Sequence, residues 1–285
     1  MKVKHRMYVV VLVVALGVVM LLSPKVRRVL KKRLRFGPEP ILVTPKKSDG
    51  EKILFLHHST GNRVWIGGVQ EAFKTYNRKH HTAYHIREQA FPKREPYGWH
   101  NYPYDYWNIW INHQDATPFQ REPTLEMICA QYDVVVFKHC YPVSKIDEDI
   151  GKPDIASDNK RIENYKLQYD ALKAKMHAFP ETQFILWTGA ALVQGATNEA
   201  QAIRAQAFFT WVKGEWDEPG DNIFLWDFYT LETSGTLYMR PEYSSGPTNS
   251  HPHPDFCKKV APFLTQRIAD IIEGLGDTSS LTGER

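Results

Sequence analysis

The strongest constraint on the fold is a series of short apolar runs that alternate with stretches of helical spacing. The runs lie at residues 52–57 (KILFLH), 132–138 (YDVVVFK), 183–187 (QFILW) and 222–226 (NIFLW), with a weaker candidate at 83–88. Helical spacing appears at 67–77, 162–179, 199–213 and 256–274. Strands that alternate with helices form a parallel sheet with both faces covered. The sequence therefore predicts a three-layer α/β/α fold with a flavodoxin-like, five-stranded parallel sheet.

The charge of the chain separates an amino-terminal segment from the rest. Residues 1–35 contain ten Lys and Arg and no Asp or Glu, so the net charge of +4 leaves −6 for the remainder. A mildly acidic body argues against nucleic acid as a partner. The three cysteines form no CxxC pair, which excludes a disulfide framework and a cysteine zinc motif.

The amino-terminal segment contains sixteen uncharged residues at 7–22 (MYVVVLVVALGVVMLL). As a helix this run is about 24 Å long, slightly shorter than the hydrocarbon core of a bilayer, and flanking Lys and Arg side chains can cover the difference. We expect a single transmembrane helix that anchors the protein. A cleaved signal peptide is the alternative, but no small-x-small cleavage site follows the run.

The remaining boundaries follow from composition. We expect a membrane anchor with its basic flank at 1–36, a Pro- and Gly-containing linker at 37–50, the α/β domain at 51–275 and a flexible tail at 276–285. Residues 91–120 form a long segment rich in Tyr, Trp and Pro with little periodicity. Its rings either stack on sugars or bases, or pack against one another.

Two polar segments stand where the ligands of a parallel sheet usually bind. The first strand ends in His57-His58-Ser59-Thr60-Gly61-Asn62, which places Ser59 in a turn at the carboxyl edge of the sheet. Ser59 is either a helix N-cap or a nucleophile with nearby N–H groups to stabilise an oxyanion. A nucleophilic serine needs a base, and residues 249–255 (NSHPHPD) supply two histidines just before the last helix.

Together these segments resemble the SGNH/GDSL hydrolase superfamily, in a bacterial branch whose nucleophile turn reads HHSTG. Further segments that resemble this branch occur in order along residues 52–273: VVVFKHCYP, WTGAAL, ATNEAQAIRAQAFFTWV, NIFLWDFYTLE and NSHPHPDFCKKVAPFL. The resemblance implies a hydrolase that cleaves acyl esters, such as acetyl esters, on a carbohydrate or a lipid, and it implies no cofactor or metal.

The resemblance also implies site residues. Ser59 is the nucleophile and His251 the base, with His253 as the alternative base and Asn249 as an orienting residue. The family's oxyanion Asn and the Asp three residues before its catalytic His are absent, since Lys138-His139-Cys140-Tyr141 and Thr248 stand at those places. Asn62, Gly98 and His139 are therefore the candidates for the oxyanion hole and pocket.

Three other functions remain open at this point. A zinc site could form from His57, His58, His139, His251 and His253, although their spacing matches no zinc signature. The missing Asn and Asp fit a catalytically weak or inactive glycan-binding module, and the same Ser/His pair could serve an O-acyltransferase. We expect the catalytic domain on the extracytoplasmic side of the membrane, because hydrolases of this type are commonly exported, although the charge distribution favours a cytoplasmic body.

Overall fold

The structure, a computed structural model, describes residues 50–93, 95–98 and 101–285. Its main sheet has five strands: β1 (Lys52–His57), β2 (His85–Ala90), β3 (Val134–Lys138), β4 (Gln183–Trp187) and β5 (Ile223–Trp226). All neighbouring strands are parallel, and their order is β2-β1-β3-β4-β5. This is the flavodoxin-like order, so the predicted sheet is confirmed.

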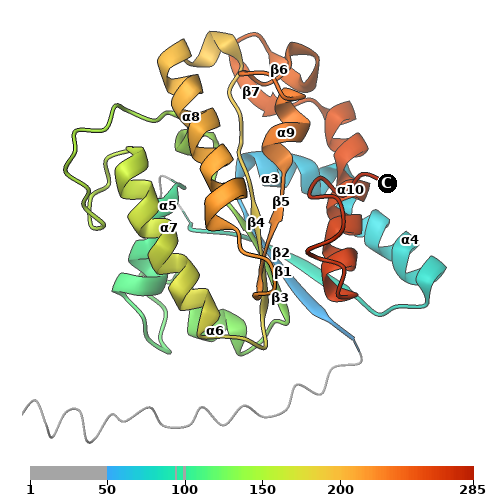
Figure 1. Cartoon of the computed structure of the whole chain (residues 1–285). Helices are drawn as coiled ribbons and strands as arrows, with labels where there is room; N and C mark the ends of the chain where they lie inside the picture. Colours follow the sequence, from blue (N-terminus) through green and yellow to red (C-terminus); the bar gives the residue numbers. More distant parts are fainter. Residues whose placement is uncertain (1–49, 94, 99–100) are drawn as a thin grey trace, which may run out of the picture. The chain divides into compact units, whose positions relative to one another are not determined.

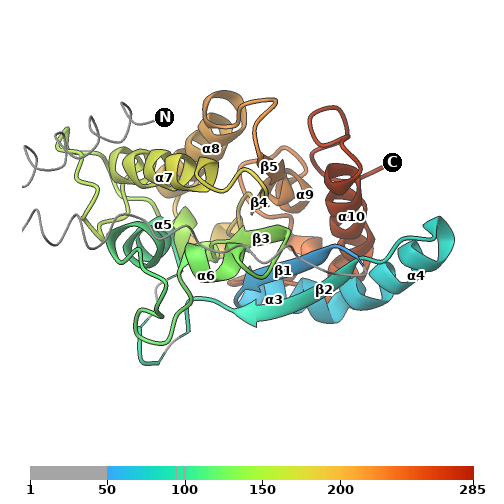
Figure 2. The ribbon, with the colours of Figure 1, turned by 90° about the horizontal axis from the view of Figure 1, so that it is seen from below.

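Helices cover both faces of this sheet, which confirms the three-layer arrangement (Figures 1 and 2). One face carries α5 (Pro103–Trp107), η2 (Asn108–Asn112), α6 (Leu125–Cys129), α7 (Ile162–His177), α8 (Glu199–Trp211) and η5 (Val212–Trp216). The other carries α3 (Ser59–Val64), η1 (Trp65–Val69), α4 (Gln70–His80) and α10 (Pro254–Ile272). The short helices η3 (Tyr141–Ser144), η4 (Gln194–Ala196), α9 (Phe228–Thr233) and η6 (Pro241–Tyr243) lie in the connections after strands β3, β4 and β5.

The strands are apolar throughout because side chains of both faces are buried. On β3, Val134 and Val136 pack toward the α10 face, whereas Val135 and Phe137 pack toward the α7 face. Side chains alternate along a strand, so Lys138 belongs to the α10 face and His139 to the α7 face. This alternation decides which of the two residues reaches the start of α3.

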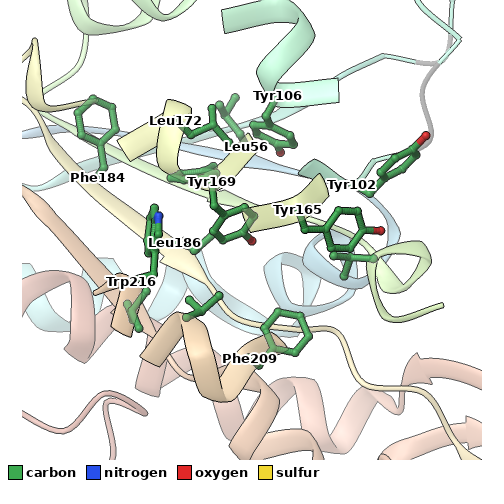
Figure 3. Packing of buried hydrophobic residues seen from close by; sticks show 14 of the residues in the cluster. Leu56, Tyr102, Tyr106, Tyr165, Tyr169, Leu172, Phe184, Leu186, Phe209 and Trp216 are labelled. Atoms are coloured by element: carbon green, nitrogen blue, oxygen red, sulfur yellow. The ribbon is translucent and has the colours of Figure 1, made fainter. Parts of the chain in front are cut away.

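The aromatic segment at 91–120 is part of the core and not a stacking surface. Tyr102, Tyr106, Trp107 and Trp110 are buried, and all but Trp107 belong to the cluster on the α7 face. Figure 3 shows Tyr102 and Tyr106 in that cluster, together with Tyr165 and Tyr169 of α7. Helices α5 and η2 fall within this segment, so its aromatic residues pack with one another and with α7.

A second, two-stranded sheet was not predicted. β6 (Ser244–Gly246) and β7 (Asn249–Pro252) form an antiparallel hairpin just before α10. The hairpin is joined to the core by a hydrogen bond from the Val193 backbone N–H to Ser250 Oγ (3.1 Å). It therefore holds the Asn249-Ser250-His251 segment in a defined position.

The carboxyl-terminal tail is packed, contrary to the expectation of a flexible segment at 276–285. Arg267 of α10 is buried and donates from Nη1 to the Gly276 carbonyl (2.6 Å). The Asp227 backbone N–H donates to the Leu281 carbonyl (2.8 Å), and Trp226 Nε1 donates to the Thr282 carbonyl (2.8 Å). Buried donors need partners, and the tail supplies these acceptors.

The membrane anchor expected at 1–36 and the linker expected at 37–50 lie outside the described residues, apart from Gly50. From residue 50 onward, within the described ranges, no helix has both the length and the apolar character needed to cross a bilayer.

Candidate active site

Ser59 is the first residue of α3, directly after His57 and His58 at the end of β1. The connection is tight, because Gly61 lies against the residues beneath it. A Cβ at Gly61 would come within 2.4 Å of His57 Cβ and 3.0 Å of Lys138 Cδ. The glycine therefore lets the first turn of α3 rest on β1 and β3, which fixes Ser59 at the carboxyl edge of the sheet.

The hydroxyl of Ser59 contacts a residue that the sequence did not single out as functional. Ser59 Oγ lies 3.4 Å from Cys140 Sγ, and the same sulfur accepts from Lys138 Nζ at 3.4 Å. Cys140 is fixed from behind, since its backbone N–H donates to the carbonyl oxygen of buried Asn101 (3.1 Å) and to the Oδ1 of the same residue. The one feature of the sequence that points to the contact among Ser59, Cys140 and Lys138 is Lys138 itself, a lysine at the end of the otherwise apolar strand β3.

His251 lies on β7, which packs against α3. Its ring is fixed by Asn249: His251 Nδ1 lies 2.8 Å from Asn249 Oδ1, and the His251 backbone N–H donates to the same oxygen at 3.1 Å. Because the His251 backbone N–H donates to this Asn249 atom, the atom is the carbonyl oxygen, which can only accept hydrogen bonds. His251 Nδ1 must therefore donate to it, so Nδ1 carries the proton and Nε2 has a free lone pair. The His251 imidazole and the Tyr141 ring are nearly perpendicular, at 87°, with centroids 5.2 Å apart.

The surroundings of His251 favour its neutral form. Burial lowers the pKa of His251, and the positive charges of Arg63 on α3 and Lys138 on β3 lower it further. A neutral imidazole with a free Nε2 is the form that a general base requires. Ser59 and His251 share no hydrogen bond in the described part of the chain, in which Ser59 Oγ rests on Cys140 instead.

His253, the alternative base, has a structural role. Its Nδ1 accepts a hydrogen bond from the Asp255 backbone N–H (3.3 Å), which makes His253 the N-cap of α10. An accepting Nδ1 places the proton of the neutral ring on Nε2, the wrong tautomer for a base acting through that atom. The geometry therefore favours His251 over His253.

The three candidates for the oxyanion hole and pocket are placed differently. Asn62 is exposed on α3 and lines the same cavity as Ser59. Gly98 lies in an exposed loop at φ +80° and does not line that cavity. His139 is buried on the opposite face of the sheet, with its ring 4.6 Å from that of Tyr106, so the expectation that it lines the pocket is not met.

A cavity of about 420 Å³ opens beside Ser59. Its lining is mostly polar and comes from the β1–α3 turn and from the edge strand β2: His57, His58, Ser59, Asn62, Glu88, Gln89 and Ala90. His57 Nε2 lies 2.6 Å from Glu88 Oε2. Burial and the nearby Lys138 lower the pKa of His57 to about 3, so at neutral pH this contact is a hydrogen bond from a neutral ring.

The zinc alternative receives no support from the geometry. In residues 50–93, 95–98 and 101–285, no group of three or more His, Cys, Asp or Glu could hold a metal ion. Of the five histidines, His57 contacts Glu88, His251 contacts Asn249, and His139 lies on the other face of the sheet against Tyr106.

No family model matches the sequence, and no curated protein matches it either. Several solved structures are similar. One is an acetyl xylan esterase (16% identity, TM-score 0.45), with 74% of this chain and 96% of that chain covered. Another is a gut microbial diltiazem-metabolizing enzyme (10%, 0.46; 80% and 47% covered), and a third is a Bacteroides fragilis protein assigned as an acylhydrolase (13%, 0.44; 80% and 90% covered). Similarity at this level says nothing about the reaction of this chain, which has to be inferred from its own site.

Proposed function

We propose that this chain is a serine esterase of the SGNH type, with Ser59 as nucleophile and His251 as general base. The observation that carries the proposal is the contact between Asn249 Oδ1 and His251 Nδ1, which leaves Nε2 free to accept a proton. The base sits on β7, and β7 packs on the helix that begins with Ser59. A fixed base tautomer next to a helix-start serine is what acyl transfer through a serine requires.

The proposed reaction has two steps. Ser59 Oγ turns from Cys140 toward His251 and attacks the acyl carbon while Nε2 takes its proton. The tetrahedral intermediate then collapses, the C–O bond to the alcohol breaks, and His251 returns the proton to that alcohol. Water, activated by the same Nε2, hydrolyses the acyl-serine and restores the free hydroxyl.

The cavity beside Ser59 supports a polar substrate. One carboxylate and two carboxamides line it, from Glu88, Gln89 and Asn62, and Ala90 is its one aliphatic lining residue. Such groups exchange hydrogen bonds with sugar hydroxyls, whereas a long acyl or lipid chain needs an apolar lining. We therefore infer an acyl ester on a carbohydrate, and acetate release from a peracetylated sugar should exceed hydrolysis of a long-chain p-nitrophenyl ester.

The decisive experiment combines turnover with covalent labelling. The full chain should hydrolyse p-nitrophenyl acetate, and a fluorophosphonate should modify Ser59, as located by peptide mass spectrometry. Ser59→Ala should abolish both signals, whereas Ser280→Ala, at an exposed serine near the carboxyl terminus, should retain them. Labelling of Ser59 would refute the inactive glycan-binding alternative, absence of both labelling and turnover would support it, and unchanged turnover by Ser59→Ala would refute the serine mechanism.

We also propose that the uncharged run at 7–22 anchors the enzyme as a single-pass membrane protein with the catalytic domain outside the cytoplasm. The length and composition of the run support the anchor. The proposed side rests on the resemblance to hydrolases that are commonly exported, and the charge distribution around the run argues against it. The full chain should stay in the membrane fraction through a carbonate wash, and a chain that starts at residue 37 should not. A reporter that works only in the cytoplasm, fused to the carboxyl terminus, should be inactive. Activity of this reporter would place the catalytic domain in the cytoplasm and contradict the proposed side.

A further inference from the structure

Lys138 is a buried cation that the proposed mechanism does not use. Its side chain is fully buried at the end of β3, with Nζ 3.4 Å from Cys140 Sγ and 5.5 Å from the centre of the Trp187 ring. None of the ion pairs formed within residues 50–93, 95–98 and 101–285 involves it. A buried ammonium without a carboxylate partner is costly, and in an active site it commonly has a function.

The carboxyl group that could cancel this charge is held mostly neutral. Glu232 of α9 is buried, and its Oε2 accepts from the Ala191 backbone N–H at 2.6 Å. Burial raises the pKa of Glu232 to about 8, although the attraction of Lys138 acts in the opposite direction. At neutral pH most Glu232 side chains are therefore protonated, and the positive charge of Lys138 remains.

This charge lies next to the nucleophile. Lys138 Nζ and Ser59 Oγ contact the same sulfur, each at 3.4 Å, so the two atoms are separated by no more than two such contacts. The stem of Lys138 runs under the first turn of α3, as its close approach to Gly61 shows. A negative charge that develops on a carbonyl oxygen attacked by Ser59 thus appears within several ångströms of the ammonium.

The Cys140 N–H at the end of β3 is not free to stabilise that negative charge, because it already donates to Asn101, and Asn101 Nδ2 donates to the Phe91 carbonyl at 2.9 Å. We propose that the buried ammonium of Lys138 stabilises, through its charge, the anionic tetrahedral intermediate that forms at Ser59, in place of a side-chain carboxamide. This proposal rests on the proposed serine esterase activity.

The same charge acts on His251. The charged and titratable groups that act on or contact His251 are Arg63 on α3, Lys138 on β3 and Tyr141 after β3; His253 follows β7 in the sequence, and β6 and η4 contain no charged or titratable side chain. Lys138 opposes the imidazolium as well, but its effect on His251 is smaller than those of burial and Arg63.

The test compares Lys138→Met with wild type, using phenylboronic acid as the probe because it forms an anionic tetrahedral adduct with a serine hydroxyl. Lys138→Met should weaken phenylboronic acid at least about 10-fold and leave KM for p-nitrophenyl acetate unchanged. The acidic limb of kcat/KM should move to higher pH, since His251 loses a neighbouring cation. Lys138→Arg should restore part of the affinity, and Lys173→Met, a remote and mostly buried lysine, should change neither property.

Two further arms decide the remaining cases. If Lys138→Met does not fold, Lys138→Gln takes its place. A second arm leaves Lys138 unchanged and compares wild type with Glu232→Gln. Above pH 8 the ionised Glu232 carboxylate of the wild type cancels the charge of Lys138, so phenylboronic acid should bind more weakly to wild type than to Glu232→Gln. Equal affinities of wild type, the Lys138 variants and Glu232→Gln would overturn the role of Lys138. A wild type that neither binds phenylboronic acid nor labels at Ser59 would instead refute the esterase itself.

Discussion

Asn249 and His251 form the contact that defines this site, with Oδ1 of Asn249 2.8 Å from Nδ1 of His251. The His251 backbone N–H donates to the same oxygen, so the tautomer of the ring follows from the geometry. A carboxamide in this place orients the ring as a carboxylate would, but it adds no negative charge to stabilise the imidazolium. The proposed base is thus oriented by a neutral partner, and none of the ion pairs within residues 50–93, 95–98 and 101–285 involves it.

The first prediction follows from this contact. Asn249→Asp should raise the pKa of His251, because a carboxylate favours the protonated ring, and the acidic limb of kcat/KM should move to higher pH while kcat increases. Asn249→Ala should lower kcat/KM on the order of 10-fold or more, because the ring loses its fixed orientation. Rates of p-nitrophenyl acetate hydrolysis from pH 5 to 9 measure both. An identical profile for all three proteins would mean that His251 is not the base.

The second prediction separates the two histidines. His253→Ala removes the N-cap of α10 and should cost about 1 kcal/mol of stability while kcat stays near the wild-type value. His251→Gln should lower kcat by about 100-fold or more with little change in stability. Urea unfolding and p-nitrophenyl acetate turnover of the two variants provide the measurements. If His253→Ala loses turnover and His251→Gln retains it, the roles assigned here are reversed.

The sequence predicts the sheet well, because buried parallel strands leave continuous apolar runs such as 134–138 and 183–187. Because Ser59 directly follows the apolar run at 52–57, the sequence also places it correctly at the carboxyl edge of the sheet. The hairpin β6–β7 is short and contains Pro, Ser and Gly in place of an apolar run, so its order depends on contacts such as Val193 to Ser250. The position of Lys138 beneath Gly61 depends on how α3 packs on β3, which no local pattern encodes.

The third prediction concerns Glu232 and the pH dependence of stability. Its pKa is raised to about 8 in the folded chain and is near 4.5 in the unfolded chain. Between these values the folded state holds a proton on Glu232 that the unfolded state has lost. The free energy of unfolding therefore falls as the pH rises from about 4.5 toward 8, and below about pH 4.5 Glu232 makes no pH-dependent difference. Glu232→Gln should therefore unfold at a urea concentration that changes less between pH 5 and 8 than that of wild type. Equal slopes would show that Glu232 is ionised in the folded protein.

The last prediction concerns His139, which lies across the sheet from Ser59. Neither of its buried ring nitrogens has a hydrogen-bond partner among the residues that the structure describes, and burial, followed by the charge of Lys138, keeps its pKa well below the usual value. Below about pH 6.5 the unfolded chain binds a proton that the folded ring cannot, so this histidine destabilises the fold increasingly as the pH falls. His139→Leu has a similar volume and no unpaired polar atoms, and it should stabilise the protein by about 1–2 kcal/mol at pH 7, and by more at pH 5. Urea unfolding at the two pH values measures this gain. Turnover of p-nitrophenyl acetate should stay unchanged, and a folded His139→Leu protein without turnover would place His139 in the site after all.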